Sequence, residues 1–494
     1  MEEKSSRLGS QLAYGYLVLP FLIFMIGWMK LYFAIPIVIV VLFCYYKITK
    51  EMEPLWTPMI HRETIVKLLF IVGIISLWVY FSGIGKFVFQ NIDHPYRNTI
   101  FNLLVESKWP VLNFDVLADE MPNTSVTGMI YYIGFWLPSA VIGKLFGLRV
   151  GYYAQAVWAV LGIVLVYYFI CAIRKKIVVW PLFVLIFFSG LDIVGHYLIG
   201  TDLRTMSSAL HLEWWDTPYQ FSSMTSQLFW VFNQAIPAWL CTMLIFTQKN
   251  NRNIVFVLAC SMLTSTLPFV GLIPLVFFFV FTRKYEGVEK RFSRPYVKAL
   301  FEDTCTIQNV LGGGIIGITS FLYLYGNAAG GMVMQKTTRG PVWEQNLAKW
   351  LVFIIIEIGI YCILIYKYQH TNKLYYFIIL CMCVLSLIRI GYTNDFCMRA
   401  TIPALFLLML LVMDTIQKSW EKRDYPVFVA LICVLVIGGV TPLHEFTRTV
   451  TETYTRIEQG EAVYAEDADA QILMSSPNFA GDAEENFFFR YLAR

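Results

Sequence analysis

The chain has 494 residues, of which 57% are hydrophobic, 17% aromatic and only 15% charged, whereas soluble globular domains carry about 25% charged residues. Its formal net charge of +4 is too small to indicate a nucleic acid as a partner. Apolar runs close to the ~20 residues that span a bilayer recur along the chain, so the sequence predicts an all-α, polytopic transmembrane helical bundle with about 12–14 crossings.

The ten cysteines indicate neither a disulfide framework nor a zinc site, because most of them lie inside apolar runs. We therefore expect no metal and no cofactor. The first apolar run continues into a second one without a small-residue cleavage site between them, which argues against a cleavable signal peptide.

The distribution of lysine and arginine predicts the topology, because cytoplasmic loops carry an excess of basic residues. Lys4 and Arg7 place the N-terminus in the cytoplasm. The basic loops agree with one another only if 127–147 does not cross the membrane, so we expect an interfacial or re-entrant segment there, broken at Pro138. The same rule predicts that the proline- and glycine-containing run 253–282 leaves the cytoplasm and returns.

One membrane unit with three parts is predicted. Residues 1–63 form an N-terminal extension of two membrane helices, 64–442 form the main transmembrane domain, and 443–494 form a C-terminal tail. We expect this tail to dock on the extracytoplasmic face. The same face would collect the loops 85–150, 200–225 and 327–349.

The first polar-rich segment, Asn91–Pro110, follows the third apolar run. Pro95 suits the first position of a helix, and the apolar pattern behind it predicts an amphipathic helix over 95–108 at the membrane surface. Two interpretations of Asp93 remain open. It caps the helix and pairs with Arg97 one turn later, or it is a half-buried general base that removes a proton from an acceptor hydroxyl.

A second polar group consists of Asp192 and His196, one helical turn apart near the outer end of a predicted crossing. Ionisable side chains inside a membrane are costly and usually face a cavity or a partner. The two residues therefore either belong to a binding site, for a sugar or for an acceptor molecule, or pair with each other as a structural contact.

A third group lies in the outer segment 211–239 and mixes tryptophans with polar side chains, namely Glu213, Trp214, Trp215 and Gln220. Apolar sugar faces stack on aromatic rings while sugar hydroxyls take directed hydrogen bonds, so this mixture is typical of a sugar site. The alternative is a belt of interfacial aromatic residues.

The turn 391–403 brings Arg399 into a helix from the outer face, next to Asn394 and Asp395. A guanidinium group there suits a lipid phosphate, which it can bind with two hydrogen bonds, although an ordinary anchoring arginine explains it equally well. Glu357 lies within an apolar run and needs a partner, for which an arginine of this turn is a candidate.

The order of these parts resembles the GT-C superfamily of integral-membrane glycosyltransferases, which use sugars linked to polyprenyl phosphate. Members carry a transmembrane helix, an acidic residue at its extracytoplasmic end, two juxtamembrane helices and then the next crossing. Here 64–84, Asp93, the 95–108 helix and 127–147 fall in that order, and the last segment contains the similar aromatic stretch YYIGFWLPSAVIGKLFG. Many members have paired acidic residues at the first position, whereas His94 follows Asp93 in this chain.

The resemblance implies an inverting transfer of a sugar from polyprenyl phosphate to a glycan, glycolipid or protein of the cell envelope. Asp93 would deprotonate the acceptor, while Arg399, supported by Arg97 or Arg339, would hold the phosphate that leaves. Enzymes of this type generally need no metal. The expected location is the bacterial cytoplasmic membrane, with the N-terminus in the cytoplasm and the active site and C-terminus outside.

Three other functions compete with this one. A transporter or flippase for lipid-linked sugars predicts ionisable residues along a path through the membrane, whereas here they cluster towards the outer side. A polysaccharide polymerase or ligase usually has a large outer loop rich in arginine, but the 200–225 loop carries only Arg204. A non-catalytic scaffold leaves the outer polar groups unexplained.

Overall fold

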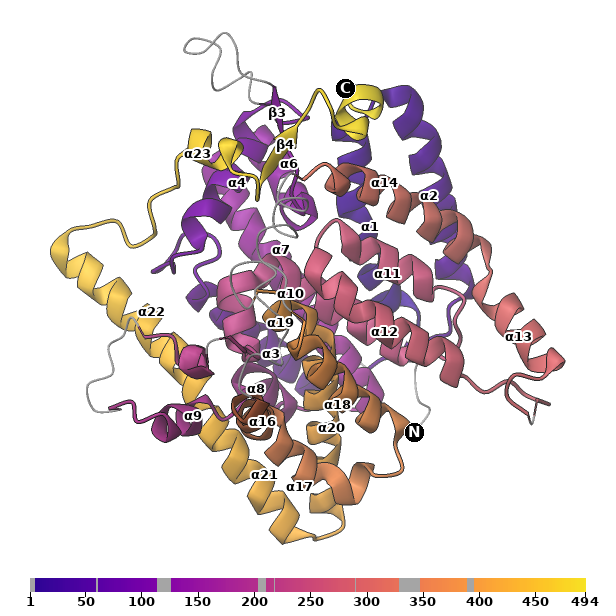
Figure 1. Ribbon diagram of the computed structural model, residues 1–494, viewed down its shortest axis with the longest axis vertical. Coiled ribbons are helices and arrows are strands. Elements are labelled where there is room, and N and C mark those ends of the chain that lie inside the picture. Colours follow the sequence, from indigo (N-terminus) through magenta and orange to yellow (C-terminus); the bar gives the residue numbers. More distant parts are fainter. Residues whose placement is uncertain are drawn as a thin grey trace.

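The structure is a computed structural model that describes residues 5–58, 61–112, 126–202, 210–216, 218–288, 290–327, 347–388 and 395–494. Helices make up most of it and pack into one bundle around a continuous apolar core (Figure 1). Within these ranges the sheets are two antiparallel pairs of short strands. The predicted site residues Arg339 and Asn394 lie outside the described residues.

The first part of the chain forms three long helices, two shorter α-helices, one 3-10 helix and three short strands. Its elements are β1 (Ser5–Ser6), α1 (Leu8–Trp28), α2 (Leu31–Glu51), β2 (Leu55–Trp56), α3 (Arg62–Phe81), α4 (His94–Glu106), β3 (Thr127–Met129), η1 (Ile133–Trp136) and α6 (Leu137–Phe146). The strand β1 pairs with β2. The helix α1 packs on α7, α10 and α11 of the next part, so the N-terminal hairpin belongs to the same bundle.

The middle of the chain contains α7 (Leu148–Arg174), α8 (Trp180–Phe187), α9 (Asp192–Leu198), η2 (Leu212–Asp216), α10 (Met224–Thr247), α11 (Ile254–Met262), α12 (Thr266–Thr282), α13 (Arg294–Thr304), η3 (Gln308–Gly313) and α14 (Gly314–Tyr325). The helix α10 is the centre of the bundle, since 94% of its most apolar stretch is buried. The helices α11 and α12 lie side by side, so the 253–282 run does reverse direction as predicted (Figure 1).

The last part contains α16 (Leu347–Ile354), η5 (Ile355–Gly359), α17 (Ile360–Gln369), α18 (Lys373–Ser386), α19 (Asp395–Ala400), α20 (Ile402–Glu421), α21 (Tyr425–Gly438), α22 (Val440–Gln459), α23 (Ala470–Ser475), β4 (Ala480–Asp482) and η6 (Phe488–Leu492). The helix α20 packs on α10 and is almost as buried, at 83% of its most apolar stretch. By contrast, only 22% is buried in α2, in α3 and in the α21–α22 rod, as expected of helices that face lipid.

Nine helices in the described part of the chain are long and apolar enough to cross a membrane, or ten if the bent pair of α13 with η3–α14 forms one span. The chain is therefore a multi-pass membrane protein. This count is lower than the predicted 12–14, because three other apolar helices, namely Ile133–Phe146, Thr266–Thr282 and Lys373–Ser386, are too short to count as full spans. Apolar runs occur both in segments that face lipid and in segments that are buried in protein. Counting apolar runs therefore overestimates the number of membrane crossings.

The segment 127–147 forms no helix long enough to span, in agreement with the prediction. It is divided into β3, η1 and α6, and the predicted break at Pro138 is wrong in its detail. Pro138 lies in the first turn of α6, where its missing N–H costs nothing, so it starts a helix rather than interrupting one.

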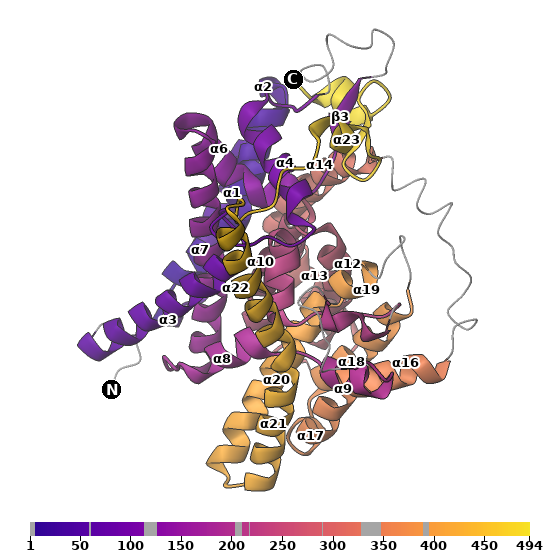
Figure 2. The same ribbon diagram turned by 90° about the vertical axis from the view of Figure 1, so that its left-hand side faces the viewer.

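The C-terminal tail docks along the same side of the bundle as α4 (Figure 2). The strand β4 pairs antiparallel with β3, and the backbone N–H groups of Lys30 and Arg494 donate to the carbonyls of Leu492 and Trp28, at 2.9 and 3.0 Å. The predicted boundary between 442 and 443 falls inside α22, which continues the line of α21, and the boundary between 63 and 64 falls inside α3.

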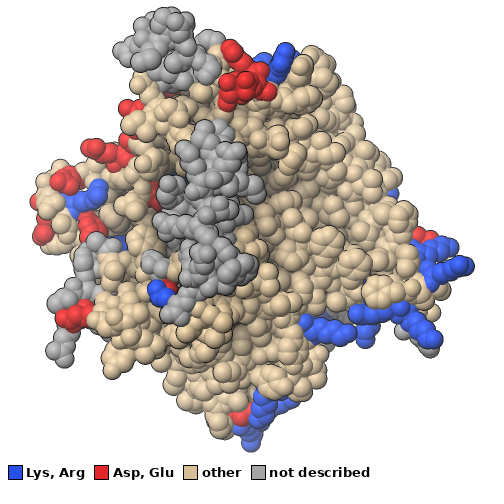
Figure 3. All heavy atoms as spheres, viewed as in Figure 1, with Lys and Arg blue, Asp and Glu red and all other residues tan. Residues whose placement is uncertain are grey.

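Acidic and basic side chains separate on the surface. In the view of Figure 3 most lysines and arginines lie along the lower right and bottom edges, around α13 and the α20–α21 turn, whereas most acidic side chains lie along the upper left edge. The broad area between them carries almost no charge, as expected of a surface that faces lipid.

Candidate active site

The predicted ion pair between Asp93 and Arg97 is present. Asp93 directly precedes α4, and its Oδ2 lies 2.7 Å from Nη2 of Arg97. The Asp93 side chain makes no capping hydrogen bond to the helix, so the capping interpretation is not supported. Instead, the side chain of Asn91 accepts the Asp93 N–H at 3.1 Å and thereby fixes the backbone where the carboxylate emerges. The Asp93 side chain keeps 37% of its surface exposed, whereas that of Arg97 keeps only 8%.

The second half of the site comes from α19, which carries Arg399. Its Nη2 lies 2.8 Å from Oδ1 of Asp395, and its Nη1 donates to the hydroxyl of Tyr132 at 3.1 Å. Burial alone would lower the pKa of Arg399, but the charges of Asp395 and Asp93 and the neighbouring phenols of Tyr131 and Tyr132 outweigh this effect and raise it. Arg399 is therefore a permanent cation.

Asp93 and Arg399, far apart in the chain, act on one another in the fold. Burial tends to raise the pKa of Asp93, but the positive charges of Arg97 and Arg399 prevail and hold it below its ordinary value. The carboxylate is consequently ionised at neutral pH. We refer to Asp93, Arg97, Asp395, Arg399, Tyr131 and Tyr132 as the Asp93 cluster.

The Asp93 cluster contains hydrogen-bond donors without acceptors. Nη1 of Arg97 and Nε of Arg399 are both buried and have no hydrogen-bond partner among the residues that the structure describes. A buried guanidinium N–H without an acceptor is costly, so such groups in a native fold call for an explanation such as a ligand or bound water. An anion with several oxygen atoms would satisfy both groups at once.

Close packing fixes the position of Arg399. A Cβ atom added to Gly271 of α12 would overlap the carbonyl oxygen of Ala400, the residue after Arg399. The backbones of α12 and α19 therefore touch at a point where only glycine fits. Any larger residue at 271 has to displace the helix that carries Arg399.

His94 does not replace the second acidic residue that the family resemblance leads one to expect. Its ring is buried, with Nε2 3.1 Å from the carbonyl oxygen of Phe229 and the ring stacked on Phe232. Burial first, and then the charge of Arg97, lower the pKa of His94 to about 3. It is neutral at physiological pH and anchors the start of α4 to α10.

Asp192 and His196 do not pair with each other, so that alternative is wrong. Oδ2 of Asp192 accepts hydrogen bonds from the hydroxyls of Ser189 and Thr441, at 2.9 and 2.8 Å. His196 instead contacts the Thr201 hydroxyl and the carbonyl of Leu212, both at 3.0 Å. Asp192 therefore links α9 to α22.

Among the described residues no arginine forms an ion pair with Glu357, and Arg399 is held by the Asp93 cluster instead. The π-helical turn η5 directs Glu357 towards α9, where its Oε1 accepts the indole N–H of Trp215 at 2.8 Å. Its other oxygen occupies the space that a side chain at Gly190 would need. The carboxyl groups of Glu357 and Asp192 lie close to each other, and Oε2 of Glu357 has no hydrogen-bond partner among the described residues.

A buried ionic network surrounds His211. Its Nδ1 lies 2.9 Å from Oε1 of Glu445 and its Nε2 lies 3.4 Å from Oε2 of Glu213. Glu445 also accepts the indole N–H of Trp230 at 3.0 Å and forms an ion pair with Arg448. Burial would lower the pKa of His211, but hydrogen bonds to the two carboxylates prevail and raise it to about 9.

The predicted sugar-binding residues are thus placed mainly inside the protein. Glu213 accepts hydrogen bonds from the side chain of Gln220 and the N–H of Ser223, at 2.9 and 2.8 Å, and Trp215 binds Glu357. Of Glu213, Trp214, Trp215 and Gln220, only Trp214 is substantially exposed, at 44%. These four side chains do not share one open surface.

The charge on His211 predicts an alkaline loss of stability. The folded pKa of about 9 lies above the ordinary 6.5, so the stabilisation is complete below pH 6.5 and is lost as the pH rises through 9. We expect a decrease of about 3 kcal/mol in the free energy of unfolding over this range, since one pKa unit corresponds to about 1.4 kcal/mol. Unfolding in detergent at several pH values measures it. The decrease should vanish in His211→Gln and persist in His444→Gln; an unchanged slope in His211→Gln would disprove the assignment.

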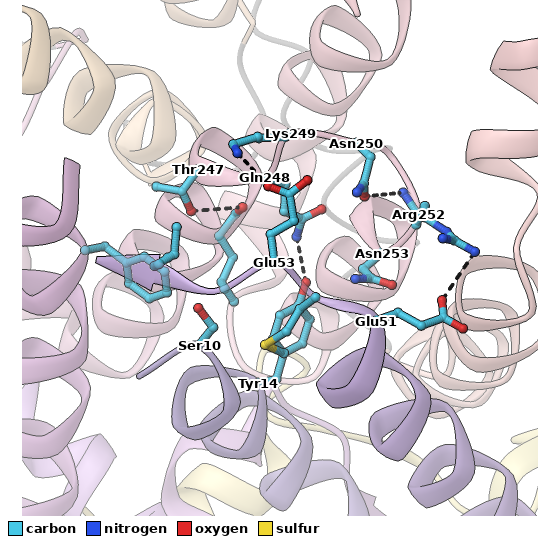
Figure 4. Close-up of a pocket in the computed structure, with 14 residues that line it drawn as sticks. Ser10, Tyr14, Glu51, Glu53, Thr247, Gln248, Lys249, Asn250, Arg252 and Asn253 are labelled. Atoms are coloured by element: carbon cyan, nitrogen blue, oxygen red, sulfur yellow. Dashed lines mark hydrogen bonds and ion pairs between the residues drawn. The ribbon is translucent and has the colours of Figure 1, made fainter. Parts of the chain in front are cut away.

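A separate polar pocket lies at the end of α2 that is remote from the docked C-terminus (Figure 4). Its charged side chains pair across it, Lys249 with Glu53 at 2.6 Å and Arg252 with Glu51 at 3.3 Å. Gln248 donates to the hydroxyl of Tyr14 at 2.7 Å. Because its cations and carboxylates neutralise one another, this pocket lacks the combination of free donors and carboxylate that marks the Asp93 cluster.

Reasoning from the sequence missed Tyr131 and Tyr132 as site residues, because aromatic side chains near a membrane surface are usual. It also missed Glu445 and Arg448, which carry no local signal. Within the described residues, no group of three or more histidine, cysteine or acidic side chains could hold a metal ion. The chain matches no family model, no curated protein and no solved structure.

Proposed function

We propose that this protein is an integral-membrane glycosyltransferase that moves a sugar from polyprenyl phosphate to an extracytoplasmic glycan, glycolipid or protein, with inversion. One observation carries the proposal. One cluster contains the predicted base, Asp93, and two of the predicted phosphate ligands, Arg97 and Arg399. In the described part of the chain, both arginines have an N–H group without a hydrogen-bond partner. A GT-C-like arrangement of the helices is part of this proposal.

The cluster suits the charge changes of such a reaction. The acceptor O–H would lose its proton to Asp93 while its oxygen attacks the anomeric carbon of the sugar. The bond from that carbon to the phosphate oxygen breaks, and the electron pair leaves with the polyprenyl phosphate. Negative charge therefore grows on the phosphate, where Nη1 of Arg97 and Nε of Arg399 can stabilise it more strongly in the transition state than in the donor.

The same geometry provides a way to tune Asp93. In the free protein two guanidinium groups keep its pKa low, which makes the carboxylate a weak base. A phosphate bound to Arg97 and Arg399 would offset part of their charge and raise the pKa of Asp93. The base would then become stronger when the donor is in place.

The surface charge supports the proposed orientation in the bacterial cytoplasmic membrane. Basic residues around α13 and the α20–α21 turn lie away from the acidic edge (Figure 3). By the positive-inside rule the basic edge faces the cytoplasm, together with the N-terminus. The Asp93 cluster and the docked C-terminus would then lie outside, where a polyprenyl-linked donor enters from the lipid.

A transporter of lipid-linked sugars remains the second candidate because of one observation. Asp192 and Glu357 lie inside candidate spans with their carboxyl groups close together, and among the described residues no basic side chain forms an ion pair with either of them. Carboxyl pairs inside a membrane are typical of proton-coupled transport.

The proposed function is tested by incubating the protein in lipid nanodiscs with polyprenyl-phosphate sugars and envelope acceptors. The expected products are free polyprenyl phosphate and a glycosylated acceptor with the opposite anomeric configuration. The transporter alternative predicts instead that lipid-linked sugar crosses the membrane of proteoliposomes and that Glu357→Gln stops it. Movement without any transfer product would overturn the proposal.

A further inference from the structure

The hydroxyl of Tyr132 has an unusual set of partners. Its oxygen accepts one hydrogen bond from Nη1 of Arg399, at 3.1 Å, and another from the hydroxyl of Tyr131. A tyrosine hydroxyl has two acceptor positions and one hydrogen to donate. Both acceptor positions are therefore filled, and in the described part of the chain no acceptor takes the Tyr132 hydrogen.

Tyr131 is itself held rigidly. Its N–H donates to the hydroxyl of Tyr323 at 3.3 Å, and that hydroxyl donates to the carbonyl of Met129 at 2.9 Å. The Tyr131 ring packs against Phe479 of the C-terminal tail, with ring centroids 5.0 Å apart, and lies 3.7 Å from the ring of Tyr132. Tyr132 consequently cannot turn away from Arg399 without breaking contacts on both sides.

We propose that the Tyr132 hydroxyl is a third donor to the phosphate group of a polyprenyl phosphate, beside Arg97 and Arg399. A phosphate has only acceptor oxygens, and two unpaired guanidinium N–H groups leave some of them without a partner. Because Arg399 and Tyr131 occupy both lone-pair positions of Tyr132, its hydrogen is the one part of the hydroxyl left for a ligand. Tyr131 is the positioning residue, because it fills one of these positions. The inference rests on the proposed function for the identity of the lipid.

The test measures binding of polyprenyl phosphate, and of the uncharged polyprenol, to the protein in nanodiscs. Losing one hydrogen bond to a charged group should weaken binding of polyprenyl phosphate roughly 10- to 100-fold in Tyr132→Phe, with polyprenol binding unchanged. Tyr131→Phe should give a smaller loss, because the Tyr132 hydroxyl remains but becomes free to rotate. Both variants should keep the melting temperature of the unliganded protein within a few degrees, because Tyr131→Phe removes one part-buried hydrogen bond and Tyr132→Phe removes two.

The matched control is Tyr296→Phe, which removes a hydroxyl that donates to the carbonyl of Phe281, outside the Asp93 cluster. It should bind both lipids as the unmodified protein does. Wild-type affinity for polyprenyl phosphate in Tyr132→Phe overturns the inference, and so does an equal loss for polyprenol. If Tyr132 is needed for phosphate binding but no sugar is transferred, the inference stands and the proposed glycosyltransferase activity alone fails.

Discussion

Replacing Asp93 with asparagine is expected to lower the turnover number about 10²- to 10⁴-fold, the range that a positioned general base contributes. Asparagine keeps the shape of the side chain and can still accept a hydrogen bond from Arg97, whose Nη2 lies 2.7 Å from Oδ2 of Asp93 in the unmodified protein. It cannot take the proton of the acceptor hydroxyl. Binding of polyprenyl phosphate should therefore persist. Steady-state transfer assays with saturating donor measure the effect.

The matched control is Asp467→Asn, since Asp467 also forms an ion pair, with Lys86 at 2.7 Å, on the side of the bundle that carries α4. That variant should transfer sugar at the unmodified rate, because Asp467 lies outside the Asp93 cluster. Undiminished turnover in Asp93→Asn would remove the base from the mechanism. Loss of donor binding together with turnover would instead indicate that Asp93 only holds Arg97 in place.

Arg399→Ala should weaken binding of polyprenyl phosphate more than about 30-fold, because removing one partner of a buried charged pair costs about 2–5 kcal/mol. Arg399→Lys should be intermediate, since an ammonium group keeps the charge but cannot contact Asp395, Tyr132 and a phosphate in one plane. Titration of the lipid into nanodiscs that contain each variant measures both losses.

A second consequence of Arg399→Ala concerns pH. Arg399 is one of the two cations that keep the pKa of Asp93 low, so its removal should raise that pKa. The acidic limb of the pH–rate profile should then move to higher pH in the variant, since Asp93 must be ionised to act. Unchanged affinity for polyprenyl phosphate would exclude Arg399 as its ligand, whatever the pH profile shows.

The membrane architecture could be predicted from the sequence because burial in lipid requires long apolar helices. The helix α4 was predicted nearly to the residue, with His94 and Glu106 as its ends against 95 and 108, because Pro95 and an apolar stripe are local signals. The role of each proline could not be predicted in the same way. Pro237 lies in the middle of the buried span α10, whereas Pro138 begins α6, and only the surrounding packing distinguishes the two.

In the candidate site, too, local contacts could be predicted from the sequence and long-range contacts could not. The contact of Asp93 with Arg97 spans one helical turn and could be predicted from the spacing. The approach of Arg399 to Asp93 was implied by family resemblance alone, because no local pattern encodes it. The charge of Glu357 alone predicts an arginine partner, whereas its neighbours in the fold are Trp215 and Asp192. Charge identifies what a buried group needs, but packing decides which neighbour supplies it.

The pairing of β3 with β4 bears on how the protein is made. Phe479 is synthesised long after the loop that it supports: its carbonyl accepts the N–H of Ile130 at 2.9 Å and its ring packs against Tyr131. The loop that carries Tyr131 and Tyr132 is synthesised more than 300 residues earlier and lacks this support until the segment around Phe479 has been made. A nascent or prematurely terminated polypeptide that lacks this segment can therefore insert its spans, but it cannot form the β3–β4 pair or the Phe479 contact that hold the two tyrosines in position.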